Sequence, residues 1–160
     1  MTPLAQAAAV CAIVLGTGAA TVTAIKGDVV EPVIPDAPWA LSTALDGRTF
    51  YTVDIVQQTG EVLEDQLIFK DGTFQSAMCQ KYCDFGWTPY QTWSEGDTVH
   101  FTATTTCPDA PHRVVWHGAV TGDEVSFEAT WTTRRWYWTH QINAIGSGSV
   151  TPPAGEAPTG

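Results

Sequence analysis

The residues that could carry redox or metal chemistry are three cysteines and four histidines between residues 79 and 140. Cys79 and Cys83 do not have the Cys-x2-Cys spacing of redox or zinc-ribbon motifs, and Cys107 follows a predicted strand. We predict a disulfide between Cys107 and either Cys79 or Cys83, which would place the domain in an oxidising compartment. The histidines show no His-x-His or His-x3-His spacing, so we predict no metal site.

The carboxylates do not form a recognisable catalytic pattern. A glycosidase would need two of them to converge in a cleft. The sequence also lacks a Gly-rich phosphate loop and a Gly-x-Ser-x-Gly elbow. We therefore predict no catalytic residue, no cofactor and no enzymatic activity. The carboxylates that we expect in or beside turns are Asp46, Asp54, Glu61, Glu64, Asp65, Asp71, Asp97, Asp123 and Glu124.

The most distinctive run is Arg-Arg-Trp-Tyr-Trp at residues 134–138. Cations beside large aromatic rings bind anions, lie at membrane interfaces or form the centres of protein interfaces. The alternative is a turn followed by a strand in which Trp136 and Trp138 fill the interior while Tyr137 faces outward. The residues that we predict to contact a partner are Gly16, Ala20, Trp39, Trp87, Tyr90, Arg134, Arg135 and Tyr137.

The charge balance excludes one class of partner. Seven Lys and Arg against 17 Asp and Glu give a net charge of −10, whereas nucleic-acid binding needs clustered positive charge. We predict no nucleic-acid partner. The length of 160 residues corresponds to about one domain, and 44% hydrophobic residues is too apolar for a wholly disordered chain.

The N-terminal segment carries no charged side chain before Lys26. The apolar run from Leu4 to Ile25 would span roughly 33 Å as a helix, which matches the hydrocarbon core of a bilayer. Gly16 and Ala20 would let another membrane helix approach closely. We predict a transmembrane anchor at residues 1–26. The alternative is a secretory signal peptide cleaved after Val22-Thr23-Ala24, although no basic residue precedes the apolar run.

Two Pro- and Gly-rich segments flank the predicted folded domain. Pro32, Pro35 and Pro38 recur at every third residue of segment 27–47, which favours an extended connector that spaces the domain from the membrane. Residues 146–160 contain Gly, Ser and Pro with little to bury, which indicates a flexible tail.

The region between them, residues 48–145, alternates apolar and polar residues with Gly-containing turns at short intervals. The connections are too short for parallel crossovers, so we predict an all-β, antiparallel meander of about eight strands closed into a barrel, with a β-sandwich as the alternative. Large side chains such as Trp116 and Phe127 should point inward. The predicted strands are 49–57, 65–70, 73–78, 89–94, 98–106, 113–121, 124–133 and 136–145.

Short motifs recur between residues 45 and 140: LDGRTF at 45–50, FKDGTF at 69–74, GD at 96–97, WHG at 116–118 and GD at 122–123. With these motifs the chain resembles a group of small exported bacterial β proteins without assigned function. The resemblance implies a fold and no activity. Lipocalins share the expected barrel by analogy, but the Gly-x-Trp signature of their first strand is missing at Gly47.

These features predict a non-catalytic accessory subunit of a larger integral-membrane complex of respiratory or photosynthetic type. Its partners would be integral-membrane subunits, and its helix would contact membrane lipid. We expect a single-pass protein of a bacterial inner membrane with a periplasmic β domain, because a disulfide needs an oxidising compartment. The alternative is a tethered or secreted lipocalin-like barrel that binds a small apolar or aromatic ligand. A filled interior would favour the first hypothesis.

Overall fold

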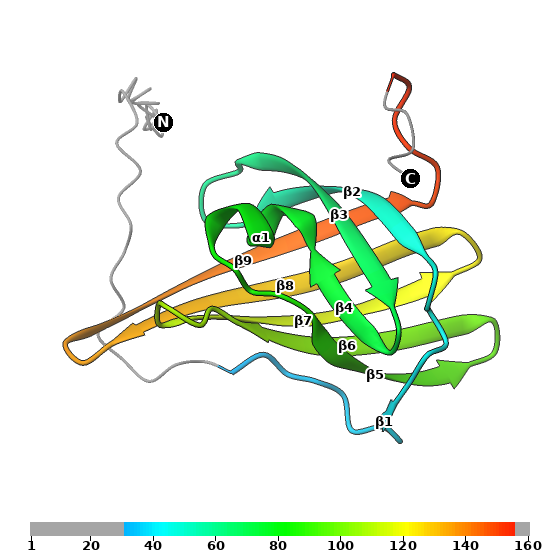
Figure 1. Cartoon of the computed structure of the whole chain (residues 1–160), viewed down its shortest axis with the longest axis horizontal. Coiled ribbons are helices and arrows are strands. Elements are labelled where there is room, and N and C mark those ends of the chain that lie inside the picture. The colour runs from blue at the N-terminus through cyan, green and yellow to red at the C-terminus, as the bar shows by residue number, and fades with distance from the viewer. Residues whose placement is uncertain (1–30, 156–160) are drawn as a thin grey trace, which may run out of the picture.

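The computed structural model describes residues 31–155, which contain one short helix and nine strands (Figure 1). The elements are β1 (Ala40–Leu41), β2 (Thr49–Val56), β3 (Val62–Lys70), β4 (Thr73–Ser76), α1 (Ala77–Tyr82), β5 (Thr88–Glu95), β6 (Thr98–Thr106), β7 (His112–Thr121), β8 (Glu124–Arg135) and β9 (Trp138–Ser149). This part of the chain includes no helix long and apolar enough to cross a membrane. The predicted span and the alternative cleavage site lie outside the described residues.

Eight of the strands form a closed, barrel-like ring. From β2 to β9, each strand pairs antiparallel with the next one along the chain, and β9 pairs with β2. The prediction of an all-β antiparallel meander of eight strands is therefore confirmed. The two-residue strand β1 adds to β5 outside the ring. Figure 1 shows β2–β4 and α1 above the longer strands β6–β9.

Aromatic side chains fill the interior of the ring. Phe69 on β3 contacts Phe50, Phe74, Tyr90 and Phe101, with ring centroids between 5.0 and 6.1 Å apart. All five rings are fully buried, because alternate residues of each strand point to the same face. Trp116 and Phe127, also predicted to point inward, belong to this core as well.

Helix α1 is absent from the sequence prediction, which extended the preceding strand to Met78. Ser76 ends that strand in an extended conformation, and its hydroxyl accepts a hydrogen bond from the Cys79 amide, as an N-cap does. The same hydroxyl donates to Asp65 Oδ2. The strand therefore stops at Ser76 because its side chain satisfies a free amide of the helix.

The connector packs against the ring instead of spacing the domain away from its surroundings. Residues 31–41, which we call the strap, run along the outer face of β5–β7 and cover the buried Val115. Trp39 makes edge contacts with Trp93 and His117, at centroid distances of 6.3 and 6.0 Å. Glu31 forms an ion pair with Arg113 at 2.9 Å. Apolar and ionic contacts along β5–β7 therefore hold the Pro-rich segment, and its prediction as a spacer is wrong for residues 31–41.

Strand β9 continues to Ser149, so the prediction that a flexible tail begins at residue 146 is wrong. Residues 144–149 are the ones that pair with β2 and close the ring. Gly146 and Gly148 permit this pairing because a larger residue would collide with its neighbours. A Cβ on Gly148 would lie 1.9 Å from the Tyr51 carbonyl oxygen, and one on Gly146 would lie 2.3 Å from the Phe127 ring.

The substitution Gly148→Ala tests this closure. We expect it to lower the free energy of unfolding by about 2–3 kcal/mol, because the added methyl collides with rigid backbone. The measurement is urea unfolding of the full chain in mild detergent, followed by tryptophan fluorescence. Ser147→Ala, on the exposed face of the same strand, is the control and should change stability little. Equal stability of the two variants would contradict the role given to Gly148.

Candidate functional site

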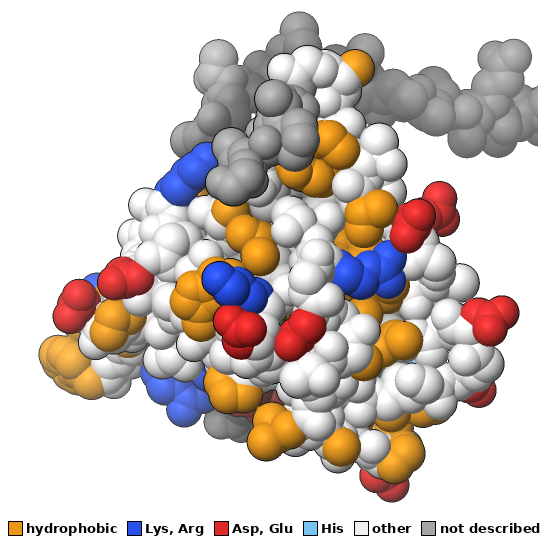
Figure 2. All heavy atoms as spheres, turned by 45° about the vertical axis from the view of Figure 1, so that its right-hand side comes forward, with side chains coloured by type: hydrophobic (Ala, Val, Ile, Leu, Met, Phe, Trp, Pro, Cys, Tyr) orange, Lys and Arg blue, Asp and Glu red, His pale blue; other side chains and the backbone are white. Residues whose placement is uncertain are grey.

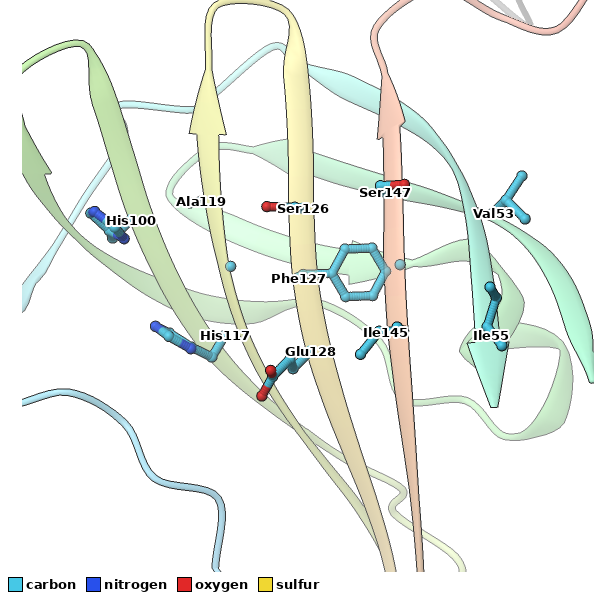
Figure 3. A pocket seen from close by; sticks show the side chains of 12 residues that line it. Val53, Ile55, His100, His117, Ala119, Ser126, Phe127, Glu128, Ile145 and Ser147 are labelled. Atoms are coloured by element: carbon cyan, nitrogen blue, oxygen red, sulfur yellow. The ribbon is translucent and has the colours of Figure 1, made fainter. Parts of the chain in front are cut away.

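A hollow of about 500 Å³ lies on the outer face of the ring, across β2, β9, β8, β7 and β6 (Figure 3). Ala119, Ser126 and Ser147 leave it open because their outward-facing side chains are small, and Gly118 and Gly146 line it with backbone. Phe127 from the core lines the hollow along with these glycines. The residues that line its rim from the outer face include Val53, Ile55, His100, His117, Glu128 and Ile145.

An apolar row borders this hollow. Val62, Ile55 and Ile145 are direct partners on the neighbouring strands β3, β2 and β9, and Val53 lies two residues before Ile55 on the same face. All four side chains are exposed. Scattered single apolar residues are normal on protein surfaces, whereas a contiguous group indicates a contact surface. We call these four residues the apolar row.

An aromatic and histidine cluster lies at the other side of the hollow. His100 stacks on Trp93 with ring centroids 4.4 Å apart, and Trp39 of the strap contacts Trp93 and His117. Trp93 Nε1 and His117 Nε2 are buried without a hydrogen-bond partner among the described residues. Burial lowers the pKa of His117, and Glu128 opposes this effect only in part. A neutral His117 can therefore donate or accept at Nε2, depending on its tautomer.

The Arg-Arg-Trp-Tyr-Trp run forms the tip of the β8–β9 hairpin, whose strands are 12 residues long each. Figure 1 shows this hairpin reaching beyond the other strands on the left. Trp136 is 95% exposed and Tyr137 is 58% exposed, so the alternative in which Trp136 fills the interior is wrong. Trp138 is half-buried. We call residues 134–138 the hairpin tip.

The turn of the hairpin tip consists of two aromatic residues, Trp136 and Tyr137. The other two-residue hairpin turns of the ring contain glycine at Gly72, Gly96 and Gly122, each with positive φ. Glycine suits such turns because it adopts positive φ without steric cost. Large aromatic side chains at the remaining turn do not help it to form, which points to a role in contact.

The predicted partner-contact residues fall into three groups. Arg134, Arg135 and Tyr137 lie together on the hairpin tip, whereas Trp39 belongs to the strap and Trp87 is exposed in the connection before β5. The prediction for Tyr90 is wrong, because its side chain is fully buried in the core. Gly16 and Ala20 lie outside the described residues.

Tyr90 and Asp46 instead connect the chain before β2 to the core. The Tyr90 hydroxyl donates to Asp46 Oδ1 at 2.8 Å and accepts from the Leu45 amide at 3.0 Å. Asp46 also accepts from the Gly72 amide in the β3–β4 turn. Burial, followed by the hydrogen bond to Asp46, raises the pKa of Tyr90 above its usual range. These bonds hold the segment before β2 against the β3–β4 turn and the core.

The structure pairs Cys83 with Cys107, one of the two predicted disulfides. The bond joins the end of α1 to the end of β6. Cys79 is free and buried, and burial raises the pKa of its thiol to about 12. The thiol is therefore protonated at neutral pH and a poor nucleophile.

Two carboxylates predicted in turns lie instead inside the ring. Asp54 and Asp65 are mid-strand residues of β2 and β3 that point inward and are buried. Asp65 accepts hydrogen bonds from Ser76 and from the amides of Gln66 and Met78. The alternation of β2 contained the signal, because Asp54 shares the phase of the inward Phe50.

Asp54 accepts a side-chain hydrogen bond from its neighbour on the same strand. Thr52 Oγ1 donates to Asp54 Oδ1 at 2.9 Å. The pKa of Asp54 is raised to about 7, mainly by burial; the bond from Thr52 opposes this rise and nearby Asp65 adds to it. Asp54 is therefore neutral through the weakly acidic range. No group of three or more His, Cys, Asp or Glu side chains within residues 31–155 is arranged to hold a metal ion.

Comparison of the chain with known proteins finds no matching family model, curated protein or solved structure. The resemblance to small exported bacterial β proteins therefore stays a prediction.

Asp54 should make stability depend on pH. An unfolded Asp loses its proton near pH 4, whereas folded Asp54 keeps it up to about pH 7. Between these values the folded state binds more protons, so the free energy of unfolding falls as pH rises, by up to about 1.4 kcal/mol per pH unit. Asp54→Asn should remove this contribution. The free energy of unfolding of the variant, relative to that of the unsubstituted protein, should therefore increase from pH 5 to pH 7.5.

The measurement is urea unfolding across this pH range, with Asp97→Asn in an exposed turn as the control. Asp65 has a raised pKa of the same sign and is present in every variant, so differences between variants report on Asp54 together with its interaction with Asp65. A constant stability difference between Asp54→Asn and the unsubstituted protein would contradict the raised pKa.

Proposed function

We propose that the chain is a non-catalytic accessory subunit of an integral-membrane complex, in which the β domain binds partner subunits through its outer surface. The filled interior is the observation that carries this proposal. An eight-stranded ring has room for its own side chains or for one small ligand. Here Phe50, Phe69, Phe74, Phe101 and Trp116 occupy that space and are fully buried.

The alternative function, a lipocalin-like barrel with a ligand inside, is disfavoured by the same observation. Admission of a ligand to the interior would require displacement of the rings packed around Phe69. Removal of one such aromatic side chain from a core costs about 3–5 kcal/mol. Binding at the outer surface requires no such rearrangement.

The outer hollow and the apolar row support a protein partner. The apolar row lies on three neighbouring strands, and the small residues of the hollow provide a recess beside it. An apolar strip next to a recess suits a side chain or strand from another subunit. The Pro-containing strap packs at the opposite side of the hollow through Trp39. It would keep the domain close to the segment that precedes the strap.

The tether and compartment belong to the same proposal. The apolar run at residues 4–25 supports a membrane anchor, and the disulfide between Cys83 and Cys107 supports an oxidising compartment such as the periplasm. A respiratory or photosynthetic assembly of a bacterial inner membrane would provide both. The proposed partners are therefore integral-membrane subunits, and no catalytic residue or cofactor is assigned to this chain.

Isolation of the tagged full chain from its native membranes in mild detergent tests this function. We expect recovery at the uncleaved mass with integral-membrane partners in fixed stoichiometry, identified by mass spectrometry. The double variant Ile55→Ser/Ile145→Ser should recover about tenfold less of the partners, since two exposed contacts are lost.

Val33→Ser is the matched control, because Val33 is an exposed aliphatic residue of the strap, away from the apolar row. Circular dichroism verifies that every variant is folded. Recovery of the chain alone and without residues 1–24 would overturn the proposal. Full partner recovery by the double variant would overturn the assignment of the outer surface.

A further inference from the structure

The hairpin tip and the start of the strap lie at the same end of the ring. The Arg134 amide donates to the Pro111 carbonyl, which places the base of the tip beside the β6–β7 connection. Glu31 pairs with Arg113 two residues further on, and Glu31 and Arg134 line one common hollow of about 510 Å³. The chain therefore enters the folded domain next to the hairpin tip.

The distance to the apolar run is short. The run ends at Ile25, six residues before Glu31. An extended chain spans at most about 3.6 Å per residue, so the end of the run lies within about 20 Å of Glu31. If this run crosses the bilayer, as the proposed function states, the end of the ring that carries the hairpin tip is held close to the membrane surface.

The side chains of the tip suit that surface. Tyr137 contacts both Trp136 and Trp138, with ring centroids 4.8 and 6.1 Å apart, so the three residues form one aromatic group. Tryptophan and tyrosine are enriched at membrane–water interfaces, where their rings lie among the lipid headgroups. Arg134 and Arg135 are exposed and have no ion pair within residues 31–155, whereas Arg48 and Arg113 are paired with Asp123 and Glu31.

The two ends of the ring differ in charge, in the sense that the proposed orientation requires. The turns at the opposite end each contain a carboxylate, namely Asp71, Asp97 and Asp123. Figure 2, which brings that end forward, shows acidic side chains around its rim, several basic side chains among them and separate groups of hydrophobic atoms. Acidic residues also occur near the tip, including Asp109. The positive charge therefore belongs to Arg134 and Arg135 of the hairpin tip and not to this end of the ring as a whole. An anionic surface would attract the tip and repel the opposite turns.

We propose that the hairpin tip, residues 134–138, is a membrane-interface anchor that places its aromatic rings among lipid headgroups and its two arginines on anionic lipid phosphates. The inference rests on the proposed tether for its geometry. It gives the domain two attachments, the apolar run and the tip, and these fix which end of the ring faces the bilayer. The outer hollow then faces sideways, toward neighbouring subunits.

The test reconstitutes the full chain in vesicles of phosphatidylcholine with one quarter phosphatidylglycerol and measures tryptophan quenching by brominated lipid. Residues 1–30 contain no tryptophan, so quenching reports only on the folded domain. We expect Trp136→Leu to reduce quenching by about half, because Trp136 and Trp138 are the two indoles of the tip. Trp87→Leu, which removes an exposed indole elsewhere, is the control and should leave quenching unchanged.

The double variant Arg134→Gln/Arg135→Gln should lower quenching in the anionic vesicles to the value found in pure phosphatidylcholine. Equal quenching of the unsubstituted protein and Trp136→Leu would overturn the proposal. So would loss of partner subunits from Trp136→Leu in the detergent isolation without any lipid quenching, because the tip would then bind protein.

Resistance to alkaline carbonate extraction, measured on the same vesicles, reports on the tether alone. If the chain resists extraction and its tryptophans are not quenched, the proposed tether is supported and the proposed role of the hairpin tip is overturned. If the chain is extracted and its tryptophans are quenched, the proposed tether is overturned and the hairpin tip is a peripheral lipid-binding element.

Discussion

The interior of the ring is full, and the other features of the domain follow from that constraint. Eight strands enclose a space about as wide as their own side chains. Phe69 occupies its centre and contacts four other buried rings. Such a core stabilises the ring through burial of large apolar surface and through edge-to-face ring contacts. It also leaves little space for a ligand, which is why the proposed recognition surfaces lie on the outside.

Closure of the ring depends on close backbone approach where β9 meets β2. Glycines at 146 and 148 permit it, and Gly146 also leaves room for the Phe127 ring and the Asp54 carboxylate. The outer hollow next to the apolar row has a separate origin, because the side chains of Ala119, Ser126 and Ser147 that face it are small.

The two ends of the ring differ in chemistry. One end has glycine turns with carboxylates, while the other has the disulfide, the start of the strap and the hairpin tip. A domain that tumbled freely would not need this polarity. The proposed membrane attachment would account for it, because one end would then face anionic lipid and the other would face away from it.

The sequence by itself determined the strands, because the period of two in apolar residues and the Gly-containing turns are local signals. It also predicted the inward side chains Trp116 and Phe127 and limited the disulfide to two pairings. The tertiary structure was needed to identify Cys83 as the partner of Cys107. It was also needed to show that Tyr90 is buried and Trp136 exposed, and that residues 146–149 belong to the ring. These outcomes depend on which surfaces meet across distant strands, and local periodicity carries no information on that.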